Sequence, residues 1–489
     1  MLLTLNAFHI YSLVVLFVHT LGIGNAAHAV MNVRSSRGAV AWAVALVSLP
    51  WLAIPLYWIF GRSKFQGYSE AIRQAYSKDY QTELHAYEEI LKHKVKLPER
   101  LSNLEKLAHE FTGIPFTSNN SLELLLDGQQ TFPKMLEAIA NAQDYILLQS
   151  YIIHDDAIGN QFKDALIERT QNGVKVRVLY DGLGSKTLTH NYIKSLRQNN
   201  IEVNAFRSTE GRGNRFQINF RNHRKILVVD GKIGFIGGLN IGDEYLGRDP
   251  HFGYWRDTHL KVTGTIVKSL QETFLKDWYW ATKEIPLVNW EIIRSDDNNQ
   301  TAFILPTSAA DRLKNCTLFY LDLINLSQER IWIASPYFVP DDSILDALKL
   351  AAVRGVDVRI ILPDRADHLS VYLCSFSYYG ELQEVGIKLY RYKRGFMHQK
   401  IILCDRFIAG VGTVNLDNRS FFLNFEVMAF AVKGDRDCQD SDLDLVDSVE
   451  QMLVRDFQAS RAIDLAKYRQ KSILFKLSAR VTRLSAPIL

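Results

Sequence analysis

Two stretches of the sequence place a histidine and a lysine, one residue apart, directly before an apolar segment. The first stretch is NFRNHRKILVVDGKIGFIGGLNIGDEY, residues 219–245, and its spaced residues are His223, Lys225, Asp230, Gly237 and Asn240. The second is GFMHQKIILCDRFIAGVGTVNLDNRSF, residues 395–421, which repeats these types with identical spacing as His398, Lys400, Asp405, Gly412 and Asn415. A single His-x-Lys on a strand is usually a structural histidine, whereas two matched copies indicate a paired functional site.

Each copy supplies side chains that can bind and transfer a phosphate group. Lys225 and Lys400 place positive charge on phosphate oxygens, while Asn240 and Asn415 donate hydrogen bonds to them. A neutral histidine can attack phosphorus, and a protonated histidine can give a proton to the departing alkoxide. Because one histidine cannot do both in one step, we predict that the two copies meet at a single phosphodiester.

Acidic side chains accompany both copies. Asp257 in YWRDTHL and Glu426 in LNFEVMAF follow the two copies at comparable positions. Each carboxylate can accept a hydrogen bond from an imidazole and fix its tautomer. Asp230 and Asp405 belong to the repeated catalytic motif itself, but we expect them to support a turn or a neighbouring group rather than to contact phosphate.

The apolar segments after each lysine indicate how such a site is held. KILVVD and KIILCD have the composition of central strands buried on both faces, so a histidine and a lysine at the mouth of each strand project from its end. Beyond residue 120 the chain also aligns with itself, for example GNQFKDALIERTQNGVKVRVLYD with DSILDALKLAAVRGVDVRIILPD. The alternation of strands and helices predicts two α/β sandwich halves with mostly parallel or mixed sheets, residues 120–295 and 296–489.

The N-terminal region has the composition of a membrane anchor. Residues 1–33 contain no Lys, Arg, Asp or Glu, and the 24 residues 38–61 carry no formal charge, which is enough to cross a hydrocarbon core of about 30 Å. We predict a transmembrane hairpin over residues 1–62 rather than a cleaved signal peptide, because a second apolar segment follows at once. Its orientation stays open, because two pairs of charges compete: Arg34 and Arg37, and Arg62 and Lys64.

Residues 63–119 are mixed in charge and helical in pattern, and we expect a solvated linker there rather than a segment resting on lipid headgroups.

The whole chain of 489 residues has 47% hydrophobic residues and a net charge of +4. It can therefore form two sizeable cores, but it lacks the basic stripe of a nucleic-acid binder. The cysteines show no metal-site spacing, and we expect buried fillers rather than disulfides or zinc at Cys316, Cys374, Cys404 and Cys438.

These motifs resemble those of a known superfamily. HxKxxxxD followed by GxxN, present twice, is similar to phospholipase D enzymes; with two N-terminal spans, SPYFVPDD, RGVDVRIILP and GTVNLDNRSFFLNFE, the chain resembles bacterial cardiolipin synthases from end to end. The resemblance implies two pseudo-symmetric halves that share one active site, no metal or other cofactor, and a phosphatidyl-histidine intermediate. It also implies that His223 and His398 are the catalytic pair, with His223 as the nucleophile. Gly238 departs from the motif, where a hydroxyl residue is more usual.

The resemblance further implies the reaction and its place. One phosphatidylglycerol gives its phosphatidyl group to the enzyme and releases glycerol, and a second supplies the attacking hydroxyl to form cardiolipin. The expected partner is anionic lipid in the bacterial inner membrane, with a multi-pass anchor, no nucleic acid, and a homo-oligomeric state left open. The alternatives are phosphatidylethanolamine as donor, hydrolysis by a phospholipase D, a nuclease, and a catalytically silent scaffold. A nuclease would need a basic groove and no membrane spans, and the intact histidines and lysines argue against a scaffold.

Overall fold

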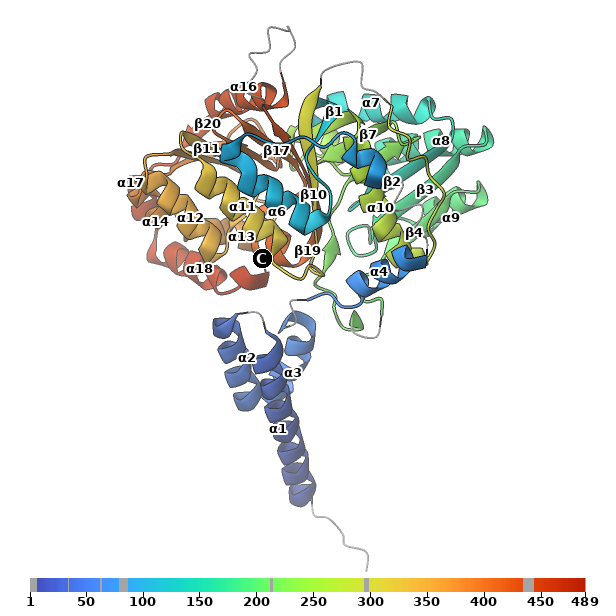
Figure 1. Cartoon of the computed structure of the whole chain (residues 1–489). Helices are drawn as coiled ribbons and strands as arrows, with labels where there is room; N and C mark the ends of the chain where they lie inside the picture. The colour runs from blue at the N-terminus through green and yellow to red at the C-terminus, as the bar shows by residue number, and fades with distance from the viewer. Residues whose placement is uncertain are drawn as a thin grey trace, which may run out of the picture. The chain divides into compact units, whose positions relative to one another are not determined.

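The computed structural model describes residues 7–33, 35–61, 64–78, 87–211, 214–293, 299–433 and 444–488. Figure 1 shows the whole chain, which divides into two units. The N-terminal unit joins Met1–Gly67 to Ser208–Phe220, and the body joins Tyr68–Arg207 to Arg221–Leu489. Several residues used in the predictions lie outside the described part: residues 1–6, Arg34 and Arg62 of the hairpin, residues 63 and 79–86 of the linker, and Cys438.

The N-terminal unit contains two apolar stretches, and only the first is one long helix. α1 (Ala7–Asn32) includes a stretch, His9–Asn32, that is long and apolar enough to cross a membrane, with a mean hydropathy of 1.6. The second stretch is divided among three shorter elements: α2 (Ser36–Ser48), α3 (Pro50–Leu56) and the π-helical turn η1 (Tyr57–Gly61). The second apolar segment of the predicted hairpin is therefore not one continuous helix. Pro50 disfavours helical geometry at the residue before it, so α2 ends at Leu49.

Close packing and one loop complete this unit. A Cβ added at Gly22 would lie 2.3 Å from the carbonyl oxygen of Leu46, so only glycine permits this approach of α1 and α2. The loop Ser208–Phe220 lies between strands of the body in sequence but belongs to this unit. Asn214 of the loop accepts a hydrogen bond from the amide of Gln66 and donates one to its carbonyl, at 3.1 and 2.8 Å.

The body consists of two repeats of alternating strands and helices. The elements before the repeats are α4 (Tyr68–Lys78), η2 (Glu99–Leu101) and α6 (Ser102–Thr112). The first repeat contains β1 (Thr117–Leu126), α7 (Asp127–Ala140), β2 (Tyr145–Ser150), α8 (Ala157–Gln171), β3 (Lys175–Asp181), α9 (His190–Gln198), β4 (Glu202–Phe206), β5 (Arg221–Asn222), β6 (Ile226–Val229), β7 (Ile233–Gly237), η4 (Asp243–Leu246), β8 (Trp255–Arg256), β9 (Thr258–Gly264) and α10 (Ile266–Thr282).

The second repeat follows the same plan. It contains β10 (Gln300–Thr307), α11 (Asn315–Leu326), β11 (Arg330–Ala334), β12 (Phe338–Val339), α12 (Asp342–Val353), β13 (Asp357–Pro363), α13 (Leu369–Phe376), α14 (Tyr379–Glu384), β14 (Lys388–Tyr392), β15 (Phe396–Met397), β16 (Ile401–Cys404), β17 (Ile408–Gly412), β18 (Leu416–Asp417), α15 (Asn418–Phe422), β19 (Asn424–Val432) and α16 (Leu445–Gln458). The C-terminal elements are β20 (Ser460–Ala462), α17 (Leu465–Arg469), α18 (Ile473–Arg483) and η5 (Ala486–Ile488).

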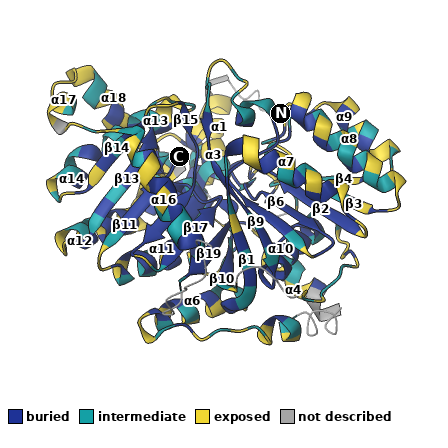
Figure 2. Cartoon of the chain, turned by 90° about the horizontal axis from the view of Figure 1, so that it is seen from above, coloured by how far each residue is buried: buried dark blue, intermediate teal, exposed yellow. Residues whose placement is uncertain are grey.

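The two repeats share one sheet. Its main order is β20-β14-β13-β11-β16-β17-β19-β10-β1-β9-β7-β6-β2-β3-β4, and each main strand of the first repeat has a counterpart at the same distance beyond the central β1–β10 pair. The pairs β2–β3–β4 and β11–β13–β14 are parallel, and the others in the order are antiparallel. The predicted α/β fold with mixed sheets is thus confirmed, although the halves join edge to edge in one sheet (Figures 1 and 2).

Each repeat has its own apolar core between the sheet and its helices. α6 belongs to the core of the second repeat, where Leu104 and Ala108 are fully buried and the helix packs against α11. The expectation of a solvated linker is wrong for this helix, because Leu101, Leu104 and Ala108 recur at a helical spacing and cover apolar surface. The filler interpretation is confirmed for the three described cysteines, which are buried: Cys316, Cys374 and Cys404.

Candidate active site

The repeated motifs lie at the ends of two central strands. Every residue of β6 and of β16 is buried, which explains why both segments are continuously apolar. His223 and Lys225 stand just before β6, and His398 and Lys400 just before β16. Both histidines are 7% exposed, and the lysines are 2% and 1% exposed. All four side chains are therefore buried.

Short strands from opposite repeats bring the two motifs together. β5, directly before His223, pairs with the start of β19, and the His223 amide donates to the carbonyl of Phe425 at 2.9 Å. β8, directly before Asp257, pairs with β15, and the His398 amide donates to the carbonyl of Arg256 at 2.8 Å. The backbone of each repeat thus positions the histidine of the other.

The same crossing pairs each imidazole with a carboxylate of the other repeat. Nδ1 of His223 lies 2.8 Å from Oε2 of Glu426, and Nδ1 of His398 lies 2.9 Å from Oδ2 of Asp257. An ionised carboxylate only accepts hydrogen bonds, so each Nδ1 donates and each Nε2 keeps its lone pair. The structure therefore brings both predicted acids to imidazoles, in a crossed arrangement.

Neighbouring donors hold the two carboxylates in place. Ser420 Oγ and Asn424 Nδ2 donate to Oε1 of Glu426, each at 2.9 Å, and the amide of Thr258 donates to Oδ1 of Asp257 at 2.9 Å. Burial raises the pKa of both carboxyls, but the surrounding lysine and histidine side chains lower it by more, so the net pKa is below the ordinary value. Both acids are consequently ionised at neutral pH.

The departure from the motif at Gly238 has a steric cause. A Cβ at this position would lie 2.0 Å from Oδ1 of Asp257, so the carboxylate already occupies the space of a side chain. In the second motif Thr413 stands at the equivalent position, and the acid is the longer Glu426. Thr413 Oγ1 accepts a hydrogen bond from the amide of Val427 at 2.9 Å. The glycine therefore accompanies the shorter acid, and the hydroxyl accompanies the longer one.

Both lysines turn back towards their own motif. Lys225 Nζ donates to the carbonyl of His223 at 2.7 Å, and Lys400 Nζ donates to the carbonyl of His398 and lies 2.9 Å from its Nδ1. Burial lowers the pKa of Lys225 to about 7 and that of Lys400 to about 8, although the buried carboxylates raise both. A bound anion would raise the pKa of both lysines and keep them charged.

The two imidazoles share one electrostatic environment. Burial lowers the pKa of His223 to about 4 and also lowers the pKa of His398. The charge of Lys400 lowers both values further, so the lysine of the second repeat acts on the histidine of the first. Both imidazoles are therefore neutral at neutral pH until an anion binds beside them.

The two motif asparagines lie in different surroundings. Asn240 Nδ2 donates to the hydroxyl of Tyr245 at 2.9 Å, and its Oδ1 accepts from the amide of Ile152 at 3.2 Å. The side-chain oxygen of Asn415 is buried and has no hydrogen-bond partner among the described residues. Its amide group can therefore turn to present its donors to a ligand, since the two ends of an amide have nearly the same shape.

The motif aspartates do not lie with the histidines. The Asp230 carboxylate follows β6 and accepts from the backbone amides of residues 143, 144 and 145 at 2.8–2.9 Å. Asp405 follows β16 and accepts from the amides of residues 328, 329 and 330 at 2.8–3.1 Å. Both have left-handed backbone with φ of 53° and 51°. The expected supporting role of both aspartates is thus confirmed, and their listing with the catalytic side chains is corrected, because they bind backbone amides at the strand ends opposite the histidines.

Sequence reasoning missed the buried side chain between histidine and lysine in the first motif. Arg224 Nη1 donates to Oδ1 of Asp277 on α10 at 2.7 Å, and Arg224 Nε donates to the carbonyl of Glu426 at 3.0 Å. Asp277 also accepts hydrogen bonds from three further side chains: Tyr68, Gln149 and Asn222. The arginine therefore connects the first motif to β19, the strand that carries Glu426. In the sequence, only the basic cluster RNHRK indicated a role for this arginine.

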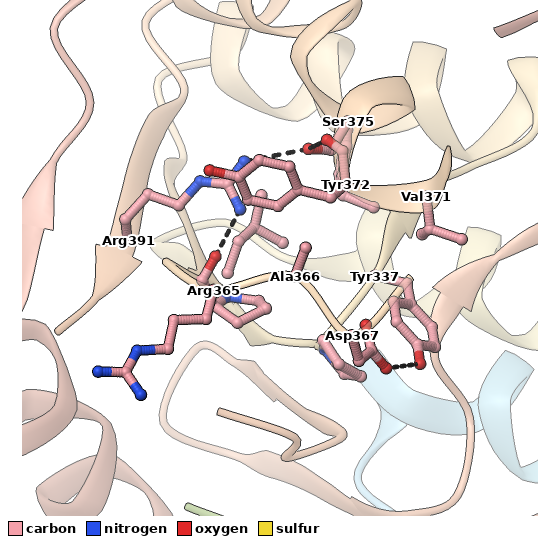
Figure 3. Close-up of a pocket in the computed structure, with 12 residues that line it drawn as sticks. Tyr337, Arg365, Ala366, Asp367, Val371, Tyr372, Ser375 and Arg391 are labelled. Atoms are coloured by element: carbon pink, nitrogen blue, oxygen red, sulfur yellow. Dashed lines mark hydrogen bonds between the residues drawn. The ribbon is translucent and has the colours of Figure 1, made fainter. Parts of the chain in front are cut away.

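Aromatic side chains border the site. The Tyr151 and His223 ring centroids are 5.0 Å apart, and the Lys225 ammonium lies 5.3 Å from the Tyr151 centroid. In the second repeat Tyr337, which follows β11, donates to the carboxylate of Asp367 (Figure 3). These two residues line a pocket of about 10 Å³, which holds about one water or one hydroxyl group. The matched stretches LLQSYI and WIASPYF contained this signal.

The geometry suits a two-step transfer at phosphorus. Two neutral imidazoles, each oriented by a carboxylate, can serve as nucleophile and as proton carrier. Two lysines supply the positive charge that phosphate oxygens need. The described residues contain no group of three or more His, Cys, Asp or Glu side chains arranged to hold a metal ion.

Comparisons with known proteins agree with this class of site. The fold resembles a solved structure of phosphatidylserine synthase from Haemophilus influenzae, with a TM-score of 0.60 and 15% identity over 79% of this chain and all of that one. The family described as "Cardiolipin synthase, PLD-like domain" matches residues 135–278 and 320–441. The fold and the crossed motifs thus define a two-repeat phospholipase D-like protein.

The curated relatives identify the family more closely. Cardiolipin synthase A of Pseudomonas fluorescens is 42% identical over 98% of this chain and 99% of its own length. Cardiolipin synthase A of Pseudomonas aeruginosa is 43% identical over 96% of this chain and 95% of its own. The chain belongs to the family of cardiolipin synthases with phospholipase D-like domains.

Proposed function

We propose that this chain is a cardiolipin synthase, a phosphatidyltransferase that converts two phosphatidylglycerol molecules into cardiolipin and glycerol. The crossed pairs His223–Glu426 and His398–Asp257 carry the proposal. They give two oriented imidazoles beside two buried lysines, which is what a transfer through a covalent histidine intermediate requires. The relatives of matching length that bear the name cardiolipin synthase support the choice of lipid substrate.

The first half-reaction forms the intermediate. Nε2 of neutral His223 attacks the phosphorus of one phosphatidylglycerol, and the bond from phosphorus to the glycerol headgroup oxygen breaks. His398, protonated once the anionic phosphodiester has raised its pKa, gives its proton to the leaving oxygen. Lys225 and Lys400 offset the negative charge on the two non-bridging oxygens.

The second half-reaction returns the enzyme to its starting state. Neutral His398 removes a proton from a headgroup hydroxyl of the second phosphatidylglycerol, whose oxygen then attacks phosphorus. The bond from phosphorus to Nε2 of His223 breaks. His223 is then neutral again and His398 is protonated again, as at the start of the cycle. Low water activity at the nearly enclosed site favours the lipid hydroxyl over water, because both histidines are 7% exposed.

The chain associates with membranes, and we propose that it is a multi-pass protein of the bacterial inner membrane. α1 is the long apolar helix, and α2 with α3 would complete the hairpin as a broken second passage. A helix break at Leu49 can lie inside the membrane only if neighbouring helices shield the backbone N–H and C=O groups that lose their helical hydrogen bonds there. Labelling of single cysteines from either side of sealed vesicles would distinguish one passage from two.

Incubation of the purified chain with phosphatidylglycerol alone tests the proposed reaction. We expect cardiolipin and glycerol in equal amounts, detected by lipid mass spectrometry and an enzymatic glycerol assay. Phosphatidic acid as the main product would instead indicate a hydrolase. Activity that appears only after phosphatidylethanolamine is added would assign that lipid as the donor. His223→Ala/His398→Ala is the inactive control.

A further inference from the structure

The C-terminal helix α18 turns its apolar side away from the protein. Five of its side chains, or those directly after it, are large, apolar and 54–82% exposed: Ile473, Leu474, Leu477, Val481 and Leu484. At about 100° per residue these positions form one stripe about 100° wide along the helix. A helix at the surface of a soluble body normally buries such a stripe, so this one lacks the partner that its sequence is suited to.

The opposite side of α18 is firmly attached to the body. The rings of Phe475 and Phe376 of α13 are 5.2 Å apart, and Ala479 is fully buried. Arg483 Nη1 donates to Glu381 of α14 at 2.8 Å. Because aromatic, small and charged side chains hold the inner face, rotation of the helix to bury its apolar stripe would break these contacts. The outward direction of the stripe is thus a property of the fold.

Basic side chains accompany the apolar stripe. Lys476 and Arg480 lie along one edge of it, and Arg480 is exposed. The helix, ILFKLSARVTR, contains no acidic residue. A wide apolar face with Lys and Arg at its border is typical of a helix that lies in the headgroup layer of an anionic membrane. A second protein copy would instead have to supply both an apolar surface and acidic groups.

We propose that the outer face of α18 docks on an anionic lipid monolayer and presents the body to its substrate. Leu369 at the start of the contacting helix α13 is 66% exposed and would extend the same surface. The five apolar side chains of the stripe enter the acyl region of the monolayer, while Lys476 and Arg480 contact the lipid phosphates. This surface belongs to the body and not to the N-terminal unit, so it would give the body a lipid attachment of its own.

The surface also leads towards the catalytic centre. α13, on which α18 rests, contributes Val371, Tyr372 and Ser375 to the pocket that Tyr337 and Asp367 border (Figure 3). α13 therefore contacts both the pocket and the helix that carries the stripe. Asp367 in turn acts electrostatically on His398 and Lys400. As an account of substrate entry this step rests on the proposed function, whereas the lipid contact itself does not.

A fluorescent probe at the stripe tests the lipid contact directly. Full-length chain carrying Cys438→Ser and Leu477→Cys is labelled with an environment-sensitive dye and reconstituted in phosphatidylglycerol vesicles that contain nitroxide-labelled lipid. The other three cysteines are buried. The matched control carries Val353→Cys on α12, which is similarly exposed at 68%, against 58% for Leu477. We expect at least fivefold stronger quenching by the nitroxide at position 477 than at position 353.

Each outcome decides the proposal. Equal quenching at both positions would overturn the proposal. It would also be overturned if the fluorescence of the dye at position 477 changed with protein concentration and not with nitroxide lipid, which would indicate a second copy on the stripe. A kinetic arm uses Leu474→Gln/Leu477→Gln, with Leu350→Gln/Val353→Gln as control. The ratio of activity on vesicles to activity on dispersed short-chain phosphatidylglycerol should fall at least fivefold in the first variant only. If the chain has no transferase activity at all, the quenching result still stands as a test of the surface.

Discussion

At the residue scale, the two histidines are alike in exposure and in bonding, yet the reaction needs them in different roles. We expect His398→Ala to accumulate a covalent phosphatidyl adduct on His223, formed about 10²-fold more slowly than in the parent because the leaving group lacks its acid. His223→Ala should form none. The measurement is rapid quenching with labelled phosphatidylglycerol at neutral to alkaline pH, where phosphohistidine survives, followed by protein-bound counts.

Exposed His251 provides the control for this experiment. His251→Ala should turn over like the parent and show no stable adduct. Label that accumulates on His223→Ala and never on His398→Ala would reverse the two roles. The roles rest on the family resemblance, because each imidazole has the same type of partner, a buried carboxylate of the other repeat.

The lysines give the pH dependence. The pKa of Lys225 is lowered to about 7 and that of Lys400 to about 8, so both lose charge as the pH rises through these values in the free protein. Binding of the anionic lipid raises both pKa values. We therefore expect kcat/KM to fall above pH about 7–8, and kcat to fall only at higher pH. Initial rates across pH 5–10 on mixed micelles test this.

A single substitution checks which group causes the alkaline limb. In Lys225→Arg the guanidinium stays charged throughout this range. The decrease of kcat/KM at alkaline pH should then follow the pKa of Lys400, about 8, even if activity is reduced. An unchanged kcat/KM profile in Lys225→Arg would assign the limb to another group.

The repeated spacing singled out the histidines and lysines that the structure brings together, because one register served both copies; the role of the two asparagines stays a prediction. The aspartates of the motif show the limit of that reasoning. Asp230 and Asp405 repeat as regularly as His223 and His398, but their carboxylates bind backbone amides at the other ends of the strands. Periodicity marks what a repeated fold needs and does not separate chemistry from support.

At the element scale, the crossing of β5 with β19 and of β8 with β15 decides the site. Each of these pairs joins residues far apart in sequence, and β5, β8 and β15 have only two residues each. No local propensity marks such short strands, so the crossed acid–histidine pairs were not predictable. The helix end at Leu49, by contrast, follows directly from Pro50.

The Asp277 carboxylate on α10 is the main support of the first crossing, because it pairs with buried Arg224. We expect Asp277→Ala to lower the free energy of unfolding of the body by about 3–5 kcal/mol, since it leaves a buried guanidinium without its partner. Asp346→Ala, at an ion pair whose aspartate is 75% exposed, should change it by less than about 0.5 kcal/mol.

Urea unfolding of the detergent-solubilised chain, followed by tryptophan fluorescence, measures both values. A loss below about 1 kcal/mol in Asp277→Ala would mean that Tyr68 or water satisfies Arg224 in its place. Asp277→Asn is informative as well, because it keeps the shape and removes the charge.

At the scale of the whole molecule, duplication has produced one sheet and one site rather than two of each. The strand order is symmetric about β1 and β10, yet neither repeat contains a complete histidine–acid pair of its own. The repeats have also diverged where they meet, with Gly238 and Asp257 on one side and Thr413 and Glu426 on the other. The sequence revealed the repeat, whereas its joining edge to edge depended on the long-range pairing of β1 with β10.

The shared site predicts the stoichiometry of the intermediate. In the proposed mechanism both imidazoles serve one phosphorus, so the chain should never carry more than one phosphatidyl group, even at saturating phosphatidylglycerol. Intact-mass spectrometry of the quenched His398→Ala chain should show a single adduct approaching one per chain with time. Two independent sites would instead give a species with two adducts in the parent chain, and a chain with half of its label on each histidine after digestion. A doubly labelled parent would therefore exclude the common centre.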